Sequence, residues 1–262
     1  MRLIREGHEG IKRSCPAATV ATCGWGGADS QAFTPSKNPG LIELFAESGQ
    51  DAFDVWAIHL HGPFVSYADR LQKDFFPMRK RTGLVRKPWY SNETALATAG
   101  GQEGIAARAV WQKILYAMAW GSTDYVWYTL ISTGCDPESG EDSYGLLTHD
   151  YKPRATFAAF AALASIVHGA NFGARIVEDG GRFAYRLDFF GKQGFALVGW
   201  DDAASGASGV MEVKTDAGSA RIVDLMGNST EVPVLGGIVS WPLSRDPSAL
   251  ILENATFLTP NP

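Results

Sequence analysis

The hydrophobic pattern of the chain changes its period near residue 170. Before that point, strand-like runs alternate with segments whose apolar residues recur every three to four positions, as in a helix. After it, apolar and polar residues alternate with a period of two, the pattern of a strand with one buried face. We therefore predict two domains, residues 1–170 and 171–262, that meet near residues 169–173.

The first domain is predicted to consist of βα units. Four strand-like runs have centres roughly 35 residues apart, the length of a strand, a helix and their loops. They lie at residues 18–22, 53–61, 88–92 and 125–131. Strands joined by helices in this way pair in parallel through right-handed crossovers. A TIM (β/α)8 barrel needs eight such units, so four units predict an α/β fold with half of a barrel.

Two segments of this domain carry apolar residues at helical spacing. The first stripe is formed by Ala107, Val110, Trp111, Ile114, Leu115 and Met118. The second stripe is formed by Phe157, Phe160, Ala161, Ala164 and Val167. Pro153 suits the first turn of the second helix, and Gly169 suits its end. Both segments are predicted helices with the apolar stripe buried.

The second domain is predicted to contain only strands. Phe183, Tyr185, Leu187 and Phe189 alternate with polar or small residues, and residues 191–194 have turn chemistry before a return strand at 195–200. Further short strands are predicted at residues 210–215, 221–225, 238–241 and 249–253. Short strands separated by turn residues at such spacing are typical of a β-sandwich.

Charge and composition exclude several classes of function. The net charge is −5 and the basic residues are scattered, so there is no electrostatic footprint for nucleic acid or an anionic membrane. The one basic run, residues 79–81, ends a predicted helix, where it complements the helix dipole. No apolar stretch is long enough to span a bilayer. The first residues do not read as a signal peptide.

The chain has three cysteines, Cys15, Cys23 and Cys135. An odd number without metal-ligand spacing argues against a disulfide framework and against structural zinc. We expect free thiols and no cofactor.

Glu93 is the strongest catalytic candidate. In an α/β barrel the reactive side chains come from the C-terminal ends of the strands, and Glu93 directly follows the strand predicted at residues 88–92. A carboxylate in such a place can attack the anomeric carbon of a sugar. The alternative is that Glu93 only stabilises the first turn of the next helix.

Two other strand ends carry candidates for sugar contacts. His59 and His61 are two residues apart on a strand and so point to one face. They suit hydrogen bonds to a sugar or to the nucleophile, although structural histidines or a metal site are open alternatives. Trp127 suits stacking on a pyranose ring, or else it belongs to the core. The acidic residues Asp136, Glu138, Glu141 and Asp142 are expected in a solvated loop, with a calcium or substrate-rim role as the alternative.

Together these residues resemble clan A retaining glycoside hydrolases, particularly the β-xylosidase and α-L-iduronidase-like group. In that group, a strand with Asp, hydrophobic residues and His-x-Tyr precedes a strand with Lys-Pro-x-x-x-x-Glu. This sequence has Asp-Val-Trp-Ala-Ile-His-Leu-His at 54–61 and Lys-Pro-Trp-Tyr-Ser-Asn-Glu at 87–93. It also has Trp127, Tyr-Gly-Leu-Leu at 144–147 and Lys-Pro-Arg-Ala-Thr at 152–156. Residues 9–16 resemble the helix before the fifth barrel strand, and residues 224–228 and 250–253 resemble the sandwich that follows the barrel.

The resemblance implies a carbohydrate substrate and a role for each candidate. Glu93 corresponds to the nucleophile on the seventh barrel strand, His59 to the sixth-strand histidine and Trp127 to the eighth-strand tryptophan. His61 stands where the family often has a tyrosine beside the nucleophile. We expect His59, His61, Asn92 and Trp127 to bind substrate. The chain then corresponds to the second half of the barrel followed by the sandwich.

The family's general acid/base has no counterpart in the sequence. That residue is the Glu of an Asn-Glu-Pro motif on the fourth strand, and the motif does not occur among the 262 residues. Retention needs two carboxyl groups about 5–5.5 Å apart. We therefore expect a truncated hydrolase whose 262 residues alone are inactive or nearly so.

Two further hypotheses stay open. One is a non-catalytic carbohydrate-binding or scaffold protein on a degenerate barrel. The other is self-association through the open edges of the half barrel. The sugar, its linkage, and the cellular location of the protein are not indicated by the sequence.

Overall fold

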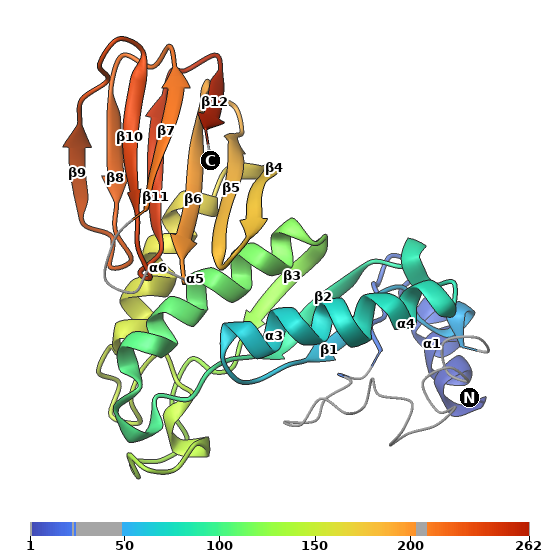
Figure 1. Ribbon diagram of the computed structural model, residues 1–262. Coiled ribbons are helices and arrows are strands. Elements are labelled where there is room, and N and C mark those ends of the chain that lie inside the picture. The colour runs from blue at the N-terminus through green and yellow to red at the C-terminus, as the bar shows by residue number, and fades with distance from the viewer. Residues whose placement is uncertain (1, 23, 25–48, 203–208, 262) are drawn as a thin grey trace. The chain divides into compact units, whose positions relative to one another are not determined.

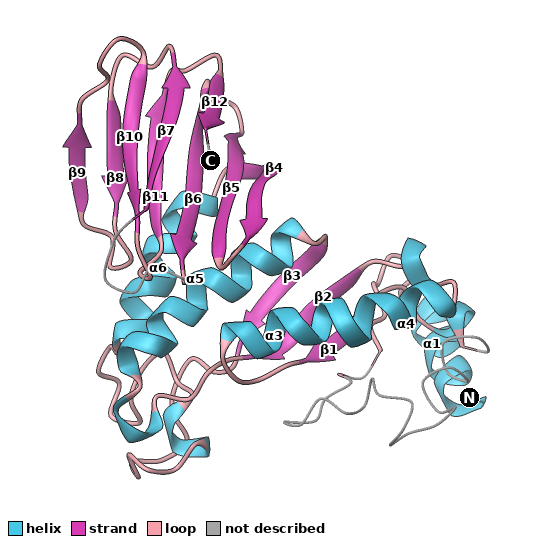
Figure 2. Ribbon diagram, in the orientation of Figure 1, coloured by secondary structure: helices cyan, strands magenta, loops and turns pink. Residues whose placement is uncertain are grey.

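The computed structural model describes residues 2–22, 24, 49–202 and 209–261. Helices occur together with parallel and antiparallel sheets, so the fold is mixed α/β (Figures 1 and 2). The contacts divide the chain into two compact units, which we describe separately. Unit 1 is the described part of Met1–Ala97 and Tyr116–Leu130, and unit 2 is the described part of Thr98–Leu115 and Ile131–Pro262. The domain boundary at residue 170 and the barrel-and-sandwich architecture stay predictions.

Unit 1 contains a parallel sheet of the order β1-β2-β3. The strands are β1 (Trp56–His59), β2 (Trp89–Thr94) and β3 (Ser122–Trp127), and both neighbouring pairs are parallel, as predicted. The predicted strand at 18–22 is reduced to one parallel bridge between Ala21 and Val55. The strand is short for a local reason. Side chains replace part of the backbone ladder, since Ala57 N–H donates to Thr22 Oγ1 (2.8 Å) and Val20 N–H donates to Asp54 Oδ2 (2.8 Å).

The helices of unit 1 are α1 (Arg2–Ser14), which has no buried residue, and a continuous helical stretch between β1 and β2. This stretch consists of α3 (Phe64–Arg70), a π-helical turn (Leu71–Phe75) and α4 (Phe76–Arg81). Pro77 has no N–H and crowds the carbonyl four residues earlier. A π-helical turn at that point relieves the clash without ending the helix. Two single turns, Gln50–Ala52 and Leu84–Arg86, precede β1 and β2 respectively.

Aromatic rings form the core between these helices and the sheet. Trp89 of β2 contacts Phe75 and Phe76 at ring-centroid distances of 5.2 and 5.7 Å, and Phe76 stacks on Trp120 at 5.3 Å. Of the basic run, Arg79 is buried rather than solvated, and it donates hydrogen bonds to the carbonyls of Leu84 and Lys87. Burial lowers its pKa to about 10, so the guanidinium stays charged at neutral pH.

Unit 2 contains two antiparallel sheets. The larger has the order β4-β5-β6-β11-β8-β9 and the smaller has the order β10-β7-β12. Strands of both sheets contribute to one buried cluster, for example Leu197 and Leu252 from the larger sheet and Met211, Val239 and Trp241 from the smaller. The strands are β4 (Ala170–Asp179), β5 (Arg182–Phe189), β6 (Gly194–Asp201), β7 (Gly209–Thr215), β8 (Ala220–Val223), β9 (Ser229–Val232), β10 (Ile238–Leu243), β11 (Ser248–Glu253) and β12 (Leu258–Asn261).

Six of these strands were predicted, and β4, β9 and β12 were not. All three lie at sheet edges, where burial imposes little alternation on the sequence. The side chains of β9 are exposed or half-buried, and β12 contains Pro260, whose missing N–H is tolerated at an edge. A weak hydrophobic pattern therefore hides edge strands.

Two long helices, α5 (Glu103–Ala119) and α6 (Ala155–Val167), match the predicted helical segments. The predicted buried face of α6 is wrong. Phe157 and Ala161 are exposed, and the buried residues are Thr156, Ala159, Ala162, Leu163 and Ile166. Because α6 is apolar on every side, the spacing of apolar residues does not distinguish its faces. Gly169, at φ 76°, follows the helix end as predicted.

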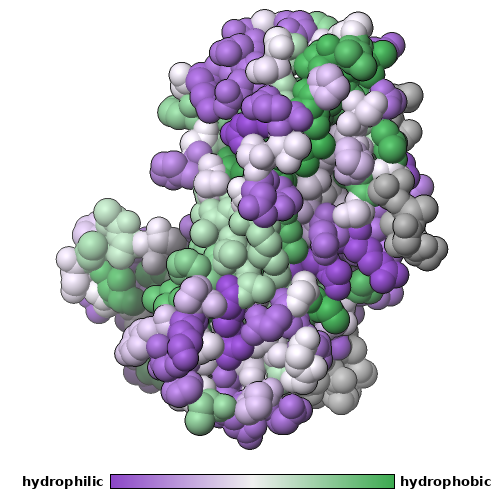
Figure 3. Space-filling view, turned by 90° about the vertical axis from the view of Figure 1, so that its left-hand side faces the viewer, coloured by the Kyte–Doolittle hydropathy of each residue, from purple (hydrophilic) through white to green (hydrophobic). Residues whose placement is uncertain are grey.

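Apolar side chains therefore reach the surface. Figure 3 shows apolar residues (green) at the surface between polar ones (purple). Within the described ranges, no helix has the length and apolar character needed to cross a membrane. Cys15 and Cys135 are exposed free thiols, as expected, and Cys23 lies outside the described residues.

Candidate active site

The C-terminal ends of the three parallel strands bring the predicted catalytic residue together with two of its predicted neighbours. In the strand register, His59 of β1 pairs with Glu93 of β2, and Thr94 of β2 pairs with Trp127 of β3. Parallel strands end at the same edge of a sheet. The edge is therefore lined by an imidazole, a carboxylate and an indole from three separate parts of the sequence.

Glu93 contacts both histidines. Its Oε1 lies 3.2 Å from His61 Nε2, and its Oε2 lies 3.6 Å from His59 Nδ1. The first distance allows a hydrogen bond in which the Nε2–H of His61 donates to the carboxylate. The side chain of Glu93 is 35% exposed, while those of His59 and His61 are 25% and 16% exposed. The carboxylate is thus held by two more deeply buried imidazoles and is still reachable from solvent.

An irregularity in β2 sets the direction of Glu93. The register shifts between Ile58 and His59 on the β1 side of β2, and on the β3 side it shifts between Trp89 and Ser91 and again between Ser91 and Thr94. Such a β-bulge breaks the strict alternation of side chains and redirects the residues in it. Asn92 and Glu93 are the two residues between the register positions of Ser91 and Thr94.

The surroundings of the two histidines are closely packed. The His59 ring lies against the backbone of Gly24, where an added Cβ would be 1.7 Å from His59 Nε2. Only glycine leaves room for the imidazole at that point. The His61 ring makes an edge-to-face contact with Tyr128 at 5.6 Å, and the Tyr128–Thr129 peptide bond is cis.

Trp127 and Asn92 lie at this sheet edge, and their predicted substrate contacts stay predictions. Trp127 is 6% exposed, so little of its ring is open to a sugar in this structure. Asn92 has a buried Oδ1 without a hydrogen-bond partner among the described residues. An unsatisfied buried acceptor of this kind is costly, and a ligand or water could satisfy it.

Behind β2 lies a group of buried hydroxyls that the sequence analysis did not find. The Tyr67 hydroxyl of α3 and the Ser91 hydroxyl are hydrogen-bonded at 2.7 Å, and both residues are fully buried. Burial raises the pKa of Tyr67, so this phenol stays protonated. The signal in the sequence was Ser91, a polar residue within the strand predicted at residues 88–92.

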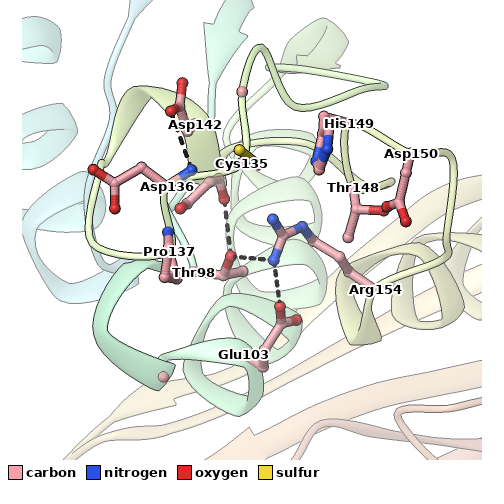
Figure 4. Close-up of a pocket in the computed structure, with 13 residues that line it drawn as sticks. Thr98, Glu103, Cys135, Asp136, Pro137, Asp142, Thr148, His149, Asp150 and Arg154 are labelled. Carbon is pink, nitrogen blue, oxygen red and sulfur yellow. Dashed lines mark hydrogen bonds and ion pairs between the residues drawn. The ribbon is translucent and has the colours of Figure 1, made fainter.

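Unit 2 contains a separate polar cavity of about 310 Å³. Figure 4 shows Arg154 directed toward Thr98 and Glu103 in this cavity. Arg154 Nη1 lies 2.7 Å from Glu103 Oε1 and donates to Thr98 Oγ1 at 2.9 Å. Two residues of the predicted acidic loop, Asp136 and Asp142, also line it.

The carboxylates of this cavity are occupied by internal partners. Asp142 accepts hydrogen bonds from the Thr133 hydroxyl at 3.1 Å and from the Asp136 N–H at 3.4 Å. Asp150 is paired with Lys152 at 2.8 Å. Among the residues that the structure describes, no three His, Cys, Asp or Glu side chains are grouped to hold a metal ion, at this cavity or around His59 and His61.

Comparisons with known proteins show a similarity of fold to solved structures. No protein-family model matches the chain, and no curated protein sequence matches it. Among solved structures, a family 39 glycoside hydrolase from the gut symbiont Bacteroides cellulosilyticus WH2 is similar, with a TM-score of 0.73 and 19% identity. An Anoxybacillus α-amylase has a TM-score of 0.54 at 12% identity. The family 86 β-porphyranase of Bacteroides plebeius has a TM-score of 0.55 at 11% identity.

These similarities cover most of this chain and about half of each relative. The alignments include 96%, 98% and 96% of this chain, but 54%, 57% and 52% of the three solved chains. The fold of this chain is therefore similar to about half of the fold of these glycoside hydrolases. At these identities the likeness is one of fold, and the reaction has to be argued from the site.

Proposed function

We propose that Glu93 is the catalytic nucleophile of a retaining glycoside hydrolase. The observation that carries this proposal is the position of its carboxylate at the end of β2, within 3.2 and 3.6 Å of His61 and His59. The glycoside hydrolase fold supports it independently. A partly exposed carboxylate at a strand end has the placement that nucleophilic attack on a sugar requires.

In the proposed first step, one oxygen of Glu93 attacks the anomeric carbon and forms a glycosyl ester. The bond to the leaving oxygen breaks, and that oxygen takes a proton from a second carboxyl group. Water then hydrolyses the ester, deprotonated by the same second group, and the configuration is retained. The N–H of His61 holds one carboxylate oxygen by a hydrogen bond, which leaves the other to attack beside His59.

The second carboxyl group is not assigned to a described residue. Glu93 contacts His59 and His61, and neither of these can serve as the second carboxyl group. We propose that the acid/base comes from a part of the protein beyond the described residues, since the similar solved chains are almost twice as long as the aligned region. Activity of the 262 residues by themselves is accordingly expected to be very low.

We further propose that the parallel strands belong to the second half of a (β/α)8 barrel and that residues 171–262 form a β-sandwich. The parallel order β1-β2-β3, with the additional bridge at Ala21, supports the first assignment. The core shared by the two antiparallel sheets supports the second. Sugar contacts by His59, His61, Asn92 and Trp127 are part of the same proposal.

Covalent trapping tests the nucleophile separately from the acid. In 2-deoxy-2-fluoro glycosides with a dinitrophenolate or fluoride leaving group, departure needs no proton, so the missing acid does not matter for the first step. The fluorine slows hydrolysis of the ester, which accumulates. We expect a mass increase of one fluoroglycosyl group on the peptide that contains Glu93, from at least one of the gluco, xylo, galacto and manno reagents.

Two variants serve as controls for the trapping experiment. Glu93→Gln should abolish the label, whereas Glu138→Gln, in the acidic loop, should leave it unchanged. Labelling at another carboxylate would contradict the proposal. So would the absence of any label when the whole reagent panel is tried on both the 262-residue chain and a longer form of the protein.

A further inference from the structure

The two faces of β2 near Glu93 have different surroundings. On one face, Glu93 meets His59 and His61. On the other, Ser91 and Thr94 are fully buried next to tyrosines of neighbouring elements. In a regular strand, residues 91 and 93 would share a face and residue 94 would lie on the opposite one. Here Ser91 and Thr94 both face the tyrosines, so the bulge has turned Glu93 away from them.

A direct hydrogen bond holds β2 at Ser91, which lies next to Asn92 and Glu93. The Ser91 hydroxyl and the Tyr67 hydroxyl are 2.7 Å apart, and both residues have no exposed surface. The Tyr67 ring is packed at 6.3 Å from Tyr125 and at 6.5 Å from Tyr116. Tyr67 is therefore held in α3 by its aromatic neighbours, and its bond to Ser91 holds β2 at the residue between the two register shifts toward β3.

The next polar pair along the strand lacks such a bond. Thr94 Oγ1 and Tyr125 Oη are buried, and neither has a hydrogen-bond partner among the described residues. Burial raises the pKa of Tyr125 well above its usual value, Tyr67 adds to that rise and the nearby Thr94 hydroxyl opposes it. The two hydroxyls are thus close to each other, but their contact is weaker than the 2.7 Å hydrogen bond between Ser91 and Tyr67. Thr94 contributes packing to the bulge rather than a polar anchor.

We propose that Ser91 and Tyr67 are positioning residues for Glu93. Their hydrogen bond holds the bulge of β2 so that the Glu93 carboxylate points at His59 and His61. The inference about geometry concerns the folded chain itself, and its catalytic consequence rests on the function proposed above. A small displacement of a reacting group can reduce a rate by about a hundredfold, so a bond that fixes direction matters more for rate than for affinity.

Three variants separate positioning from stability. Ser91→Ala and Tyr67→Phe each leave one buried hydroxyl unsatisfied, which lowers stability. The double variant removes both hydroxyls, so stability should largely return, while the bulge still lacks its anchor. Thr94→Val is the matched control, because it removes a buried hydroxyl of the same strand that is not part of the Ser91–Tyr67 hydrogen bond.

The first readout is the imidazole NMR signals of His59 and His61, which report the contact with Glu93 without any substrate. In Ser91→Ala and in the double variant they should shift toward their positions in Glu93→Gln. In Thr94→Val they should match the unmodified chain. Unchanged signals in Ser91→Ala and in the double variant would overturn the positioning role.

The second readout is the rate of Glu93 labelling by the activated fluoroglycoside. We expect Ser91→Ala and the double variant to be about tenfold slower at saturating reagent, with the half-saturating concentration unchanged. Recovery of the rate in the double variant along with its melting temperature would show a purely structural role and overturn the proposal. If the histidine signals shift but no form of the protein is labelled, the positioning role stands and the hydrolase proposal fails.

Discussion

Glu93 in unit 1 and Glu103 in unit 2 have nearly equal exposure, 35% and 40% of the side chain, but their partners differ. Glu93 meets two imidazoles at 3.2 and 3.6 Å. Glu103 meets the Arg154 guanidinium at 2.7 Å in the first turn of α5, where a helix N-terminus also favours an anion. Exposure alone therefore does not distinguish the proposed nucleophile from a carboxylate in an ion pair with arginine.

The partner explains the difference in expected chemistry. A guanidinium is always protonated, and its short contact stabilises the charge of the carboxylate, which makes that carboxylate a weaker nucleophile. An imidazole offers one N–H to one oxygen and changes its charge near neutral pH. The Glu103 arrangement is suited to organising loops, whereas in the proposed mechanism the Glu93 arrangement leaves one oxygen available for attack.

The largest effect should come from removing the two carboxylates in turn, in a form of the protein that turns over aryl glycosides. Glu93→Ala should lower kcat by at least about a thousandfold, the scale of losing a nucleophile. Azide should partly restore turnover, because the small anion fits the space left by the side chain. Glu103→Ala should retain activity and show no response to azide. Equal losses in both variants would remove the distinction drawn between the two glutamates.

A smaller effect is expected from crowding His59. In Gly24→Ala the new Cβ would lie 1.7 Å from His59 Nε2, so the imidazole has to move away from its place beside Glu93. We expect labelling of Glu93 to slow by about ten- to a hundredfold. Gly104→Ala is the control, because a Cβ there meets nothing within 4 Å. A normal labelling rate in Gly24→Ala would mean that His59 does not support the nucleophile.

The Arg154 pair should affect stability instead. Arg154→Met removes the contacts to Glu103 and Thr98, and we expect the free energy of unfolding to fall by about 1–2 kcal/mol, discounted for the exposed part of the pair. Urea denaturation measures this change. With Glu103→Gln added, the loss should be smaller than the sum of the two single losses. Strict additivity would show that the pair contributes no coupling.

The sequence predicted the elements that carry Glu93 better than it predicted their local geometry. Strand spacing led correctly to parallel β1, β2 and β3, and the rule that parallel strands end at one edge led to Glu93 beside His59 and His61. The bulge could not be predicted, since strict alternation would place Glu93 on the side of Ser91. The contact of Ser91 with Tyr67 depends on how α3 packs on β2, which no local pattern encodes.

The same limit explains the errors in unit 2. The buried face of α6 was assigned from the spacing of phenylalanines, but alanines make every face of that helix apolar, and Ala159 and Ala162 are buried instead. The cavity around Arg154 was also missed. Arg154 belongs to the Lys-Pro-Arg-Ala run noted in the sequence, but its partners Thr98 and Glu103 are more than fifty residues away.

The smallest effect concerns the stability of the fold at acid pH. Asp150, a carboxylate that lines the cavity, is paired with Lys152, and a carboxylate without such a partner would not show the effect. Lys152 first and the Thr148 hydroxyl second lower the pKa of Asp150 to about 2, from an ordinary value of 3.8. A carboxylate whose pKa is depressed in the folded state stabilises the fold above its unfolded pKa, and that contribution is lost as the pH falls through the folded value.

Asp150→Asn should therefore be slightly less stable than the unmodified chain at pH 6, and the difference should shrink between pH 4 and pH 2. Both side chains of the pair are exposed to solvent, so 1 M salt should reduce the difference at pH 6 as well. Denaturation at the three pH values measures it, and a difference that grew on acidification would mean that the ion pair with Lys152 is not formed in solution.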